Sequence, residues 1–227
     1  MAAWGLVENV LGHISARVSD SELLIRCRGP RESGLAATTA ADVQAVPLRG
    51  SRDLGAWRVP NELPIHAELM RRRPEVTAVV HAHPPAVVAF SLLDRPLVPI
   101  YGAYDIPGAR LAAAGIPSWP RSALIATDEL AAGMADALGD RPALLLRGHG
   151  LVAVAQGPPE EAVAEAVLVA LAVDSLARHT LTVLQAGGRP EPIPPEDLAS
   201  LPDLGRAFNV AAMWRHALTR IGNPDVV

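Results

Sequence analysis

The sequence predicts an α/β fold in a single domain that spans residues 1–227. A length of 227 residues fits one domain. Half of the residues are hydrophobic and only 19% are charged, so the chain can bury a sizeable core. Short apolar runs typical of strands alternate with longer segments of helical periodicity, and this alternation favours an α/β architecture.

The first third of the chain predicts strands, a loop and a helix. Residues 4–18 are typical of a short helix followed by a glycine turn into a strand, and residues 22–27 (ELLIRC) predict a second strand. Residues 28–42 are rich in Gly, Pro and Thr and predict a loop. Residues 63–73 have helical periodicity, and we expect this helix to end before Pro74.

The middle of the chain predicts a buried strand that leads directly into a helix. The β-branched, apolar run Val76–Val80 is typical of such a strand. A His-Ala-His-Pro-Pro segment follows at residues 81–85, and its prolines favour the first turn of a helix, which we expect to continue through Leu93. Residues 97–121 contain four prolines and predict a loop.

A helix and a pair of strands are predicted next. Thr127 is a typical N-cap for a helix that reaches Leu138, with Glu129 in its first turn. The apolar runs Leu144–Leu146 and Leu151–Ala155 predict two strands, and the Arg-Gly-His-Gly segment between them predicts their turn.

The last part of the chain predicts two helices within the same domain. Residues 158–186 form a long segment of helical periodicity. Residues 187–202 are rich in proline and predict a linker, and residues 203–221 predict a C-terminal helix.

Charge and composition exclude several classes of function. The net charge is −4, the sequence pI is ≈ 6.0, and no basic stretch is longer than Arg71–Arg73, so we expect neither nucleic acid nor a membrane surface as a partner. All 20 cationic residues are arginines, which excludes Schiff-base lysine chemistry and a Walker A lysine. Cys27 is the only cysteine, which excludes an internal disulfide. With no export signal or long uninterrupted apolar run recognised, we expect a cytoplasmic protein.

Three histidines stand where strand ends can bring them together. His81 and His83 follow an apolar strand in an i, i+2 relation, so their side chains point to one face. His149 lies in the Gly-His-Gly turn between two strands. Three neutral imidazoles with an open position are typical of a catalytic Zn²⁺ site, and Mn²⁺, Fe²⁺ and Co²⁺ accept the same donors. The alternative is a chance His-x-His and an ordinary turn histidine.

Glu62 is the candidate acid/base residue. It lies in a Pro-Asn-Glu-Leu-Pro segment just before the helix at residues 63–73. A carboxylate at this place can transfer protons beside a metal. The alternative is a helix cap, because an acidic side chain at a helix N-terminus is favourable by itself.

Taken together, four segments resemble the class II aldolase/adducin family: GHISAR (12–17), NELPIH (61–66), VVHAH (79–83) and LLLRGHGLVA (144–153). The resemblance implies a three-layer α/β/α fold around a mixed, mainly antiparallel sheet. It also implies a homotetramer with the metal site near subunit interfaces. Matched by motif, His81, His83 and His149 are the expected metal ligands, and Glu62 is the expected catalytic acid/base.

The sequence departs from the pattern of the sugar-phosphate aldolases in that family. His13 stands where those enzymes have a phosphate-binding Asn, Gly34–Thr39 stands in place of the phosphate loop, and Pro60-Asn61 replaces a Ser-Ser pair. A sugar-phosphate substrate is therefore disfavoured. We expect His13 and Arg17 to meet a substrate carboxylate instead, since Arg offers a bidentate fork.

The chain most resembles the 3,4-dihydroxyphthalate decarboxylase branch of the family. The similar segments are GHISAR (12–17), PNELPIH (60–66), HAHPP (81–85), residues 101–120 with their Ile-Pro-Gly, and Trp214-Arg215-His216. This similarity implies a metal-dependent decarboxylase that converts a dihydroxylated aromatic acid to protocatechuate and CO₂. The expected catalytic residues are Glu62, with a raised pKa, and His13. The expected substrate-binding residues are Arg17, Asn61, Tyr101, Tyr104 and His216.

Two other functions stay open. One is a class II aldolase or epimerase that acts on a non-phosphorylated hydroxy-keto or sugar substrate with the same metal site. The other is a non-catalytic interaction module, as in the cytoskeletal members of the family. His66 is interpreted either as a partner of the site or as an ordinary helix histidine, and we expect His179 on a helix surface or interface.

Overall fold

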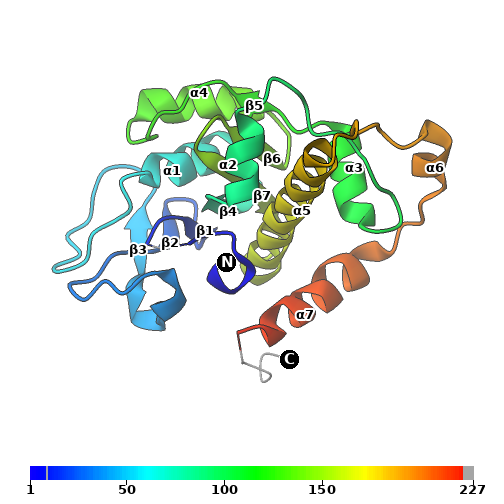
Figure 1. The fold of residues 1–227 in the computed structure, drawn as a ribbon. Helices are drawn as coiled ribbons and strands as arrows, with labels where there is room; N and C mark the ends of the chain where they lie inside the picture. Colours follow the sequence, from blue (N-terminus) through cyan, green and yellow to red (C-terminus); the bar gives the residue numbers. More distant parts are fainter. Residues whose placement is uncertain (9, 222–227) are drawn as a thin grey trace.

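The computed structural model of the protein describes residues 1–8 and 10–221 (Figure 1). Its described part contains one seven-stranded sheet in the order β3-β2-β1-β4-β7-β6-β5. Neighbouring strands are antiparallel except β5 and β6, which are parallel. The predicted α/β fold with a mixed, mainly antiparallel sheet is therefore confirmed.

The strands are β1 (His13–Arg17), β2 (Glu22–Arg26), β3 (Val43–Pro47), β4 (Val76–Ala82), β5 (Ser118–Trp119), β6 (Ala143–Leu146) and β7 (Gly150–Gln156). The α-helices are α1 (Leu63–Arg72), α2 (Pro85–Ser91), α3 (Ile106–Ala114), α4 (Asp128–Leu138), α5 (Pro159–Gln185), α6 (Pro195–Ser200) and α7 (Met213–Thr219). Short 3₁₀ turns lie at Ala2–Trp4, Leu35–Ala37 and Ala40–Asp42, and a π-helical turn at Ala207–Ala212 leads into α7.

Helices cover both faces of the sheet, so its central strands are apolar on both sides. Along β7, Leu151 and Ala153 belong to the core that includes α2 and α5, whereas Val152 and Val154 belong to the core that includes α1 and α4. Successive side chains of a strand point to opposite faces, and a strand covered on both faces is a continuous apolar run. Figure 1 shows α1 and α4 together on one side, with α5 across the sheet from them.

Helix α5 is the one helix of the described chain that is long and apolar enough to cross a membrane by length and composition alone. Its most apolar 18-residue window has a mean hydropathy of 1.5, and 44% of that window is buried inside the protein. Ala166 and Ala170 lie in the core with β4 and β7, and the buried, acidic Asp174 interrupts the apolar sequence. A core helix of a globular domain has the same properties.

The predicted loop at residues 97–121 is wrong in part, because it contains α3 and β5. Pro107 stands in the first turn of α3, where its missing N–H costs nothing. The Asp105 side chain accepts a hydrogen bond of 3.0 Å from the Gly108 N–H and caps the helix. The prolines here mark a helix start as well as irregular backbone.

Other elements also differ from the prediction. Strand β3 follows the predicted loop at 28–42 and was not predicted. It forms by pairing with β2, and a local sequence pattern does not predict this long-range contact. The predicted linker at 187–202 contains the short helix α6. The helix predicted near residue 4 is a single 3₁₀ turn at Ala2–Trp4.

Candidate metal centre

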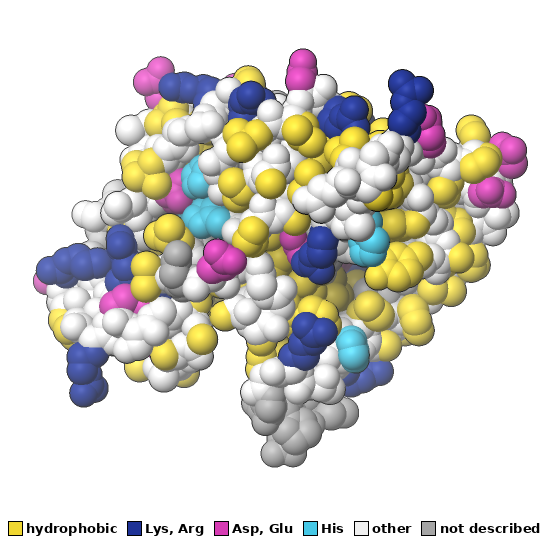
Figure 2. Space-filling model, viewed as in Figure 1, with side chains coloured by type: hydrophobic (Ala, Val, Ile, Leu, Met, Phe, Trp, Pro, Cys, Tyr) yellow, Lys and Arg dark blue, Asp and Glu magenta, His cyan; other side chains and the backbone are white. Residues whose placement is uncertain are grey.

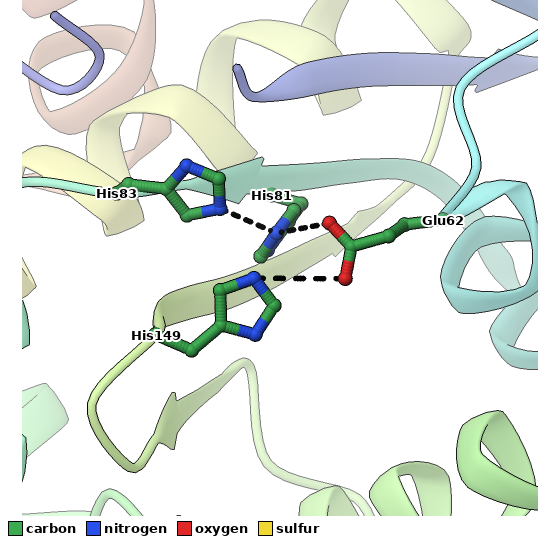
Figure 3. A group of neighbouring side chains, drawn as sticks. All are labelled: Glu62, His81, His83 and His149. Atoms are coloured by element: carbon green, nitrogen blue, oxygen red, sulfur yellow. Dashed lines mark hydrogen bonds and ion pairs between the residues drawn. The ribbon is translucent and has the colours of Figure 1, made fainter. Parts of the chain in front are cut away.

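Four side chains converge at one end of the central strands (Figure 3). Glu62, His81, His83 and His149 each offer a ligand atom, and these atoms all lie within 4.8 Å of one another. Nε2 of His83 lies 2.8 Å from Nε2 of His81. The two carboxylate oxygens of Glu62 lie 3.2 Å from Nε2 of His81 and 3.5 Å from Nε2 of His149. This arrangement brings together the three predicted ligands and the predicted acid/base residue.

The orientation of His81 is set by the neighbouring strand. His81 is the next-to-last residue of β4 and is fully buried. Its Nδ1 lies 2.9 Å from the carbonyl oxygen of Leu151 on β7. A carbonyl only accepts, so Nδ1 carries the proton and the Nε2 lone pair of the neutral ring points into the group. Metal-binding histidines are commonly oriented in this way.

His149 is placed by a tight turn that requires both flanking glycines. Gly148 has φ 61°, a left-handed conformation that glycine adopts without strain. A Cβ at Gly150 would collide with the carbonyl oxygen of Ala82 and the ring of His83. The Gly-His-Gly segment therefore lets β7 approach β4 at the point where the other two histidines stand.

Glu62, which the sequence predicted only as an acid/base residue, lies among the four possible ligands. It precedes α1, but its side chain makes no helix-capping hydrogen bond. Its Oε1 instead accepts a hydrogen bond of 2.9 Å from the Ile125 N–H. Burial raises the pKa of Glu62, but the adjacent His149 and His81 side chains and the hydrogen bond from the Ile125 N–H outweigh it and hold that pKa well below its usual range. The raised pKa expected from the sequence is therefore wrong for this geometry.

The donor set fits a divalent metal ion. Burial is the main cause that lowers the pKa of His83, to about 3, so its imidazole is neutral and can donate a lone pair. Nδ1 of His149 is buried without a hydrogen-bond partner within the described part of the chain. Three imidazole nitrogens and one carboxylate oxygen form the kind of set that Zn²⁺ and related ions bind.

A second histidine pair extends from this group into the core. His13 is the register partner of His81 across β1 and β4, and the two ring centroids lie 5.1 Å apart. Nδ1 of His13 lies 2.7 Å from Nε2 of His66, and Nδ1 of His66 lies 2.6 Å from Oγ of Ser15. Burial, the largest cause, and the neighbouring histidines lower the pKa of both His13 and His66. His66 is therefore a buried partner of His13 and not an ordinary surface histidine.

A pocket opens beside the four converging side chains. It is lined by Val10, Leu11, Gly12, His13, Arg26, Arg28, Pro60, Asn61, Glu62, His83 and Leu124. Figure 2 shows histidine and acidic side chains gathered at one place on the surface of this face of the molecule. The pocket includes the predicted residues His13 and Asn61.

Sequence reasoning missed Arg26 and Arg28, which stand where β2 ends. The signal was present as an alternating Arg-Cys-Arg at the end of an apolar strand. Gly34–Thr39, which stands in place of the family's phosphate loop, does not line this pocket in the described structure.

Arg17, a predicted substrate-binding residue, lies away from this site in its own chain. It lies at the far end of β1 from His13, roughly 13 Å along the strand. Its Nε donates a hydrogen bond of 3.1 Å to the carbonyl oxygen of Val76, and its Nη2 donates to the carbonyl oxygen of Met70. The guanidinium thus satisfies carbonyls at the end of α1 and the start of β4.

The predicted substrate-binding residues Tyr101, Tyr104 and His216 also lie away from the cluster of Glu62 and the three histidines in their own chain. Tyr101 and Tyr104 pack against His179, with ring centroids 5.5 and 5.1 Å from it. Burial raises the pKa of Tyr101 to about 12. His216 is exposed on α7 and packs edge-on against Trp4, with ring centroids 5.9 Å apart. None of the three predicted residues lines the pocket within the described chain.

Comparisons with known proteins show the family to which the chain belongs. Residues 1–181 match the family described as Class II Aldolase and Adducin N-terminal domain. The chain is 50% identical to the 3,4-dihydroxyphthalate decarboxylase of Arthrobacter keyseri, over 97% of this chain and 89% of that protein. It is 51% identical to the 3,4-dihydroxyphthalate decarboxylase of Terrabacter sp. (strain DBF63), over 97% and 92%. Among solved structures, the L-fuculose-1-phosphate aldolase of Thermus thermophilus is 34% identical, with a TM-score of 0.65 over 82% of this chain and 90% of that one. The chain belongs to the class II aldolase and adducin family.

Proposed function

We propose that this protein is a metal-dependent decarboxylase that converts 3,4-dihydroxyphthalate to protocatechuate and CO₂. The observation that carries the proposal is the group of Glu62, His81, His83 and His149 beside a pocket that contains His13 and two arginines. Relatives that are 50–51% identical over nearly the whole chain bear the name of this activity. The absence of lysine excludes an imine between the substrate and a lysine side chain, and a bound divalent metal can stabilise the negative charge left after C–C cleavage.

His81, His83 and His149 are the residues that would hold the ion, and the Glu62 carboxylate lies beside them as the group that transfers protons. When bound, a divalent metal supplies Lewis-acid stabilisation of negative charge on a substrate oxygen. We propose Zn²⁺ as this metal, supported by the three imidazole donors.

Glu62 is proposed to carry the proton. Its lowered pKa keeps it ionised at neutral pH, so it can accept the proton of the substrate hydroxyl next to the leaving carboxylate. The same proton then passes from Glu62 to the ring carbon that bears this carboxylate. The C–C bond breaks, its electron pair restores the aromatic phenolate, and CO₂ leaves. A proton from water finally neutralises the phenolate.

His13 is the second side chain that we propose acts on the substrate. It lines the same pocket, and its Nδ1 is held by His66, which leaves Nε2 as its other titratable atom. The neutral form of His13 is favoured by burial. Its proposed task is to donate a hydrogen bond to the leaving carboxylate.

The assembly is proposed to be a cytoplasmic homotetramer with active sites near subunit interfaces. Tyr101, Tyr104 and His216 line no part of the pocket of their own chain, as suits residues that serve a neighbouring subunit. The mouth of the pocket carries the exposed apolar side chains Val10 and Leu124, 41% and 56% exposed, as suits a surface that another subunit covers.

A class II aldolase acting on a non-phosphorylated substrate is the second candidate. The 34% identity to a solved sugar-phosphate aldolase favours it, because such an enzyme stabilises an equivalent carbanion. It differs from a decarboxylase in releasing an aldehyde in place of CO₂.

The test is CO₂ release from 3,4-dihydroxyphthalate by the metal-loaded protein, measured beside an EDTA-treated sample and an EDTA-treated sample reloaded with metal. We expect release only in the two loaded samples, with protocatechuate as the stoichiometric product. Loaded protein of confirmed metal content that releases no CO₂ would overturn the proposal and favour the aldolase.

A further inference from the structure

Arg26 and Arg28 line the pocket but have no part in the metal or proton steps proposed above. Arg26 is the last residue of β2, and Arg28 follows two residues later. Both reach the cavity that also contains His13, Glu62 and His83. The side of this pocket formed by the end of β2 is thus cationic and stands beside the proposed reaction centre.

Arg26 is a buried cation with an unused donor. Only 10% of its side chain is exposed, and its Nη2 pairs with Oε1 of Glu32 at 2.5 Å. The hydrogen bond from Arg26 is the main cause that lowers the pKa of Glu32, so this carboxylate is ionised. Nε of Arg26 is buried and has no hydrogen-bond partner among the described residues. A buried donor without a partner is costly, and an anion in the pocket can satisfy it.

Arg28 has a fixed backbone and a largely uncommitted side chain. Arg28 and Arg58 form an isolated antiparallel β-bridge. The Arg28 N–H donates to the Arg58 carbonyl over 2.8 Å, and the Arg58 N–H donates to the Arg28 carbonyl over 2.9 Å. Its Nη2 donates to Oδ1 of Asn61 over 3.4 Å, a long contact. A guanidinium carries several N–H donors in a rigid fork, so most of those of Arg28 remain available to a planar anion.

We propose that Arg26 and Arg28 bind the carboxylate that the substrate keeps, so that the enzyme requires an aromatic 1,2-dicarboxylate. This inference rests on the proposed function. The leaving carboxylate and its neighbouring hydroxyl must lie at Glu62 and the histidines for the proton transfers to occur. The retained carboxylate sits on the adjacent ring carbon and enters the pocket as a second anion. Two arginines offer this carboxylate charge-assisted and bidentate hydrogen bonds.

A matched pair of substrates tests the assignment. 2,3-Dihydroxybenzoate has the same leaving carboxylate and hydroxyls as 3,4-dihydroxyphthalate and lacks only the retained carboxylate. We expect Arg28→Gln to lower kcat/KM for the dicarboxylate by roughly 10- to 100-fold, mainly through KM, because a hydrogen bond to a charged group is lost. For 2,3-dihydroxybenzoate, kcat/KM should be low in the wild type and unchanged by the substitution.

Two controls separate this effect from a general loss of charge or structure. Arg58→Gln removes the same charge from the exposed partner of the backbone bridge, which does not line this pocket, and should leave both substrates unaffected. Arg26→Gln leaves Glu32 without its cationic partner, so it is made together with Glu32→Gln, and Glu32→Gln alone is the reference. The double variant should show the same selective loss as Arg28→Gln.

A binding measurement gives a readout without turnover. Protocatechuate retains the carboxylate in question and catechol lacks it, so calorimetry on the metal-loaded protein compares the two. We expect Arg28→Gln to weaken protocatechuate binding roughly 10- to 100-fold and to leave catechol binding unchanged. Equal effects on both ligands, or no effect on either, would overturn the inference. If wild-type protein released no CO₂ but preferred protocatechuate through Arg28, the proposed function would fail while this carboxylate site stood.

Discussion

His13 and His66 are joined by a hydrogen bond of 2.7 Å between Nδ1 of the first and Nε2 of the second. Nδ1 of His66 continues the chain to Oγ of Ser15 at 2.6 Å. A neutral imidazole donates through one nitrogen and accepts through the other, so the direction of these two hydrogen bonds sets which nitrogen of His13 carries the proton. The tautomer of His13 in the pocket therefore depends on the buried residues His66 and Ser15.

Replacement of His66 by Leu should impair both stability and activity. The substitution leaves Nδ1 of His13 buried without its partner, which costs about 1–3 kcal/mol in free energy of unfolding. The tautomer of His13 is then no longer set, and we expect kcat to fall by tenfold or more, roughly the range of outer-shell effects in metal enzymes. Urea unfolding and decarboxylation assays check the two effects. Ser15→Ala should show a smaller effect in the same direction. If His66→Leu kept the wild-type stability and the wild-type kcat, the role of the His13–His66 pair would be contradicted.

The stability of metal-free protein should fall with acidification, partly because of His66. Burial is the main cause that lowers the pKa of His66 from 6.5 to about 3. Below pH 6.5 the unfolded chain takes up a proton at this residue and the folded protein does not, so the contribution is complete above pH 6.5 and is lost as the pH falls toward 3. Each such group changes the free energy of unfolding by up to about 1.4 kcal/mol per pH unit.

Urea unfolding of EDTA-treated protein at several pH values measures this slope. We expect a shallower slope for His66→Leu than for the wild type between pH 6.5 and pH 4. Parallel slopes for the two proteins would show that His66 already titrates normally in the folded state. Arg58→Gln, which changes an exposed arginine, is the control and should keep the wild-type slope.

Substitution of Glu62 by Gln should remove proton transfer while preserving local structure. The amide oxygen can still accept from the Ile125 N–H, whereas the carboxylate charge is gone. We expect kcat to fall by about 10²–10⁴-fold, the usual contribution of a general acid/base. Metal content is measured on the same samples, and Glu75→Gln, at an exposed ion pair with Arg73, serves as the control. A fully metal-loaded Glu62→Gln with full activity would refute the proposed role.

His83→Asn should weaken metal binding without unfolding the domain. His83 supplies one of the converging nitrogens and is partly exposed in the pocket, so its loss removes a ligand and leaves the apolar core intact. We expect the metal Kd to rise by more than about 100-fold, beyond the effect typical of outer-shell partners. Competition with a chelator measures this Kd, with Glu75→Gln, at a carboxylate paired with Arg73, as reference. A Kd equal to that of the reference would remove His83 from the ligand set.

Local periodicity was enough to predict several elements that carry the site. Helix α1 ends before Pro74 and α4 begins after its Thr127 cap, as the sequence predicts. Strand β4 was predicted from an apolar run that is buried on both faces. The pairing of His81 with His83 also follows from local geometry, since residues two apart in an extended chain share a face.

Elements that depend on distant partners were predicted less well. Strand β3 exists through its register with β2, and α3 is held in place by contact with α5. The prolines of residues 97–121 are compatible with both a loop and a helix start, so the sequence of this segment did not distinguish them.

The sequence by itself determined the chemical repertoire: histidines and a carboxylate at strand and helix ends, arginine as the only cation, and no lysine. Only the tertiary structure decided how these groups are used. The register of β1 against β4 places His13 beside His81. The packing of α1 on the sheet brings Glu62 beside His81, His83 and His149. The same packing turns Arg17 toward backbone carbonyls and away from the site. Distances between residues some fifty positions apart depend on strand register and helix packing, and a local sequence pattern contains neither.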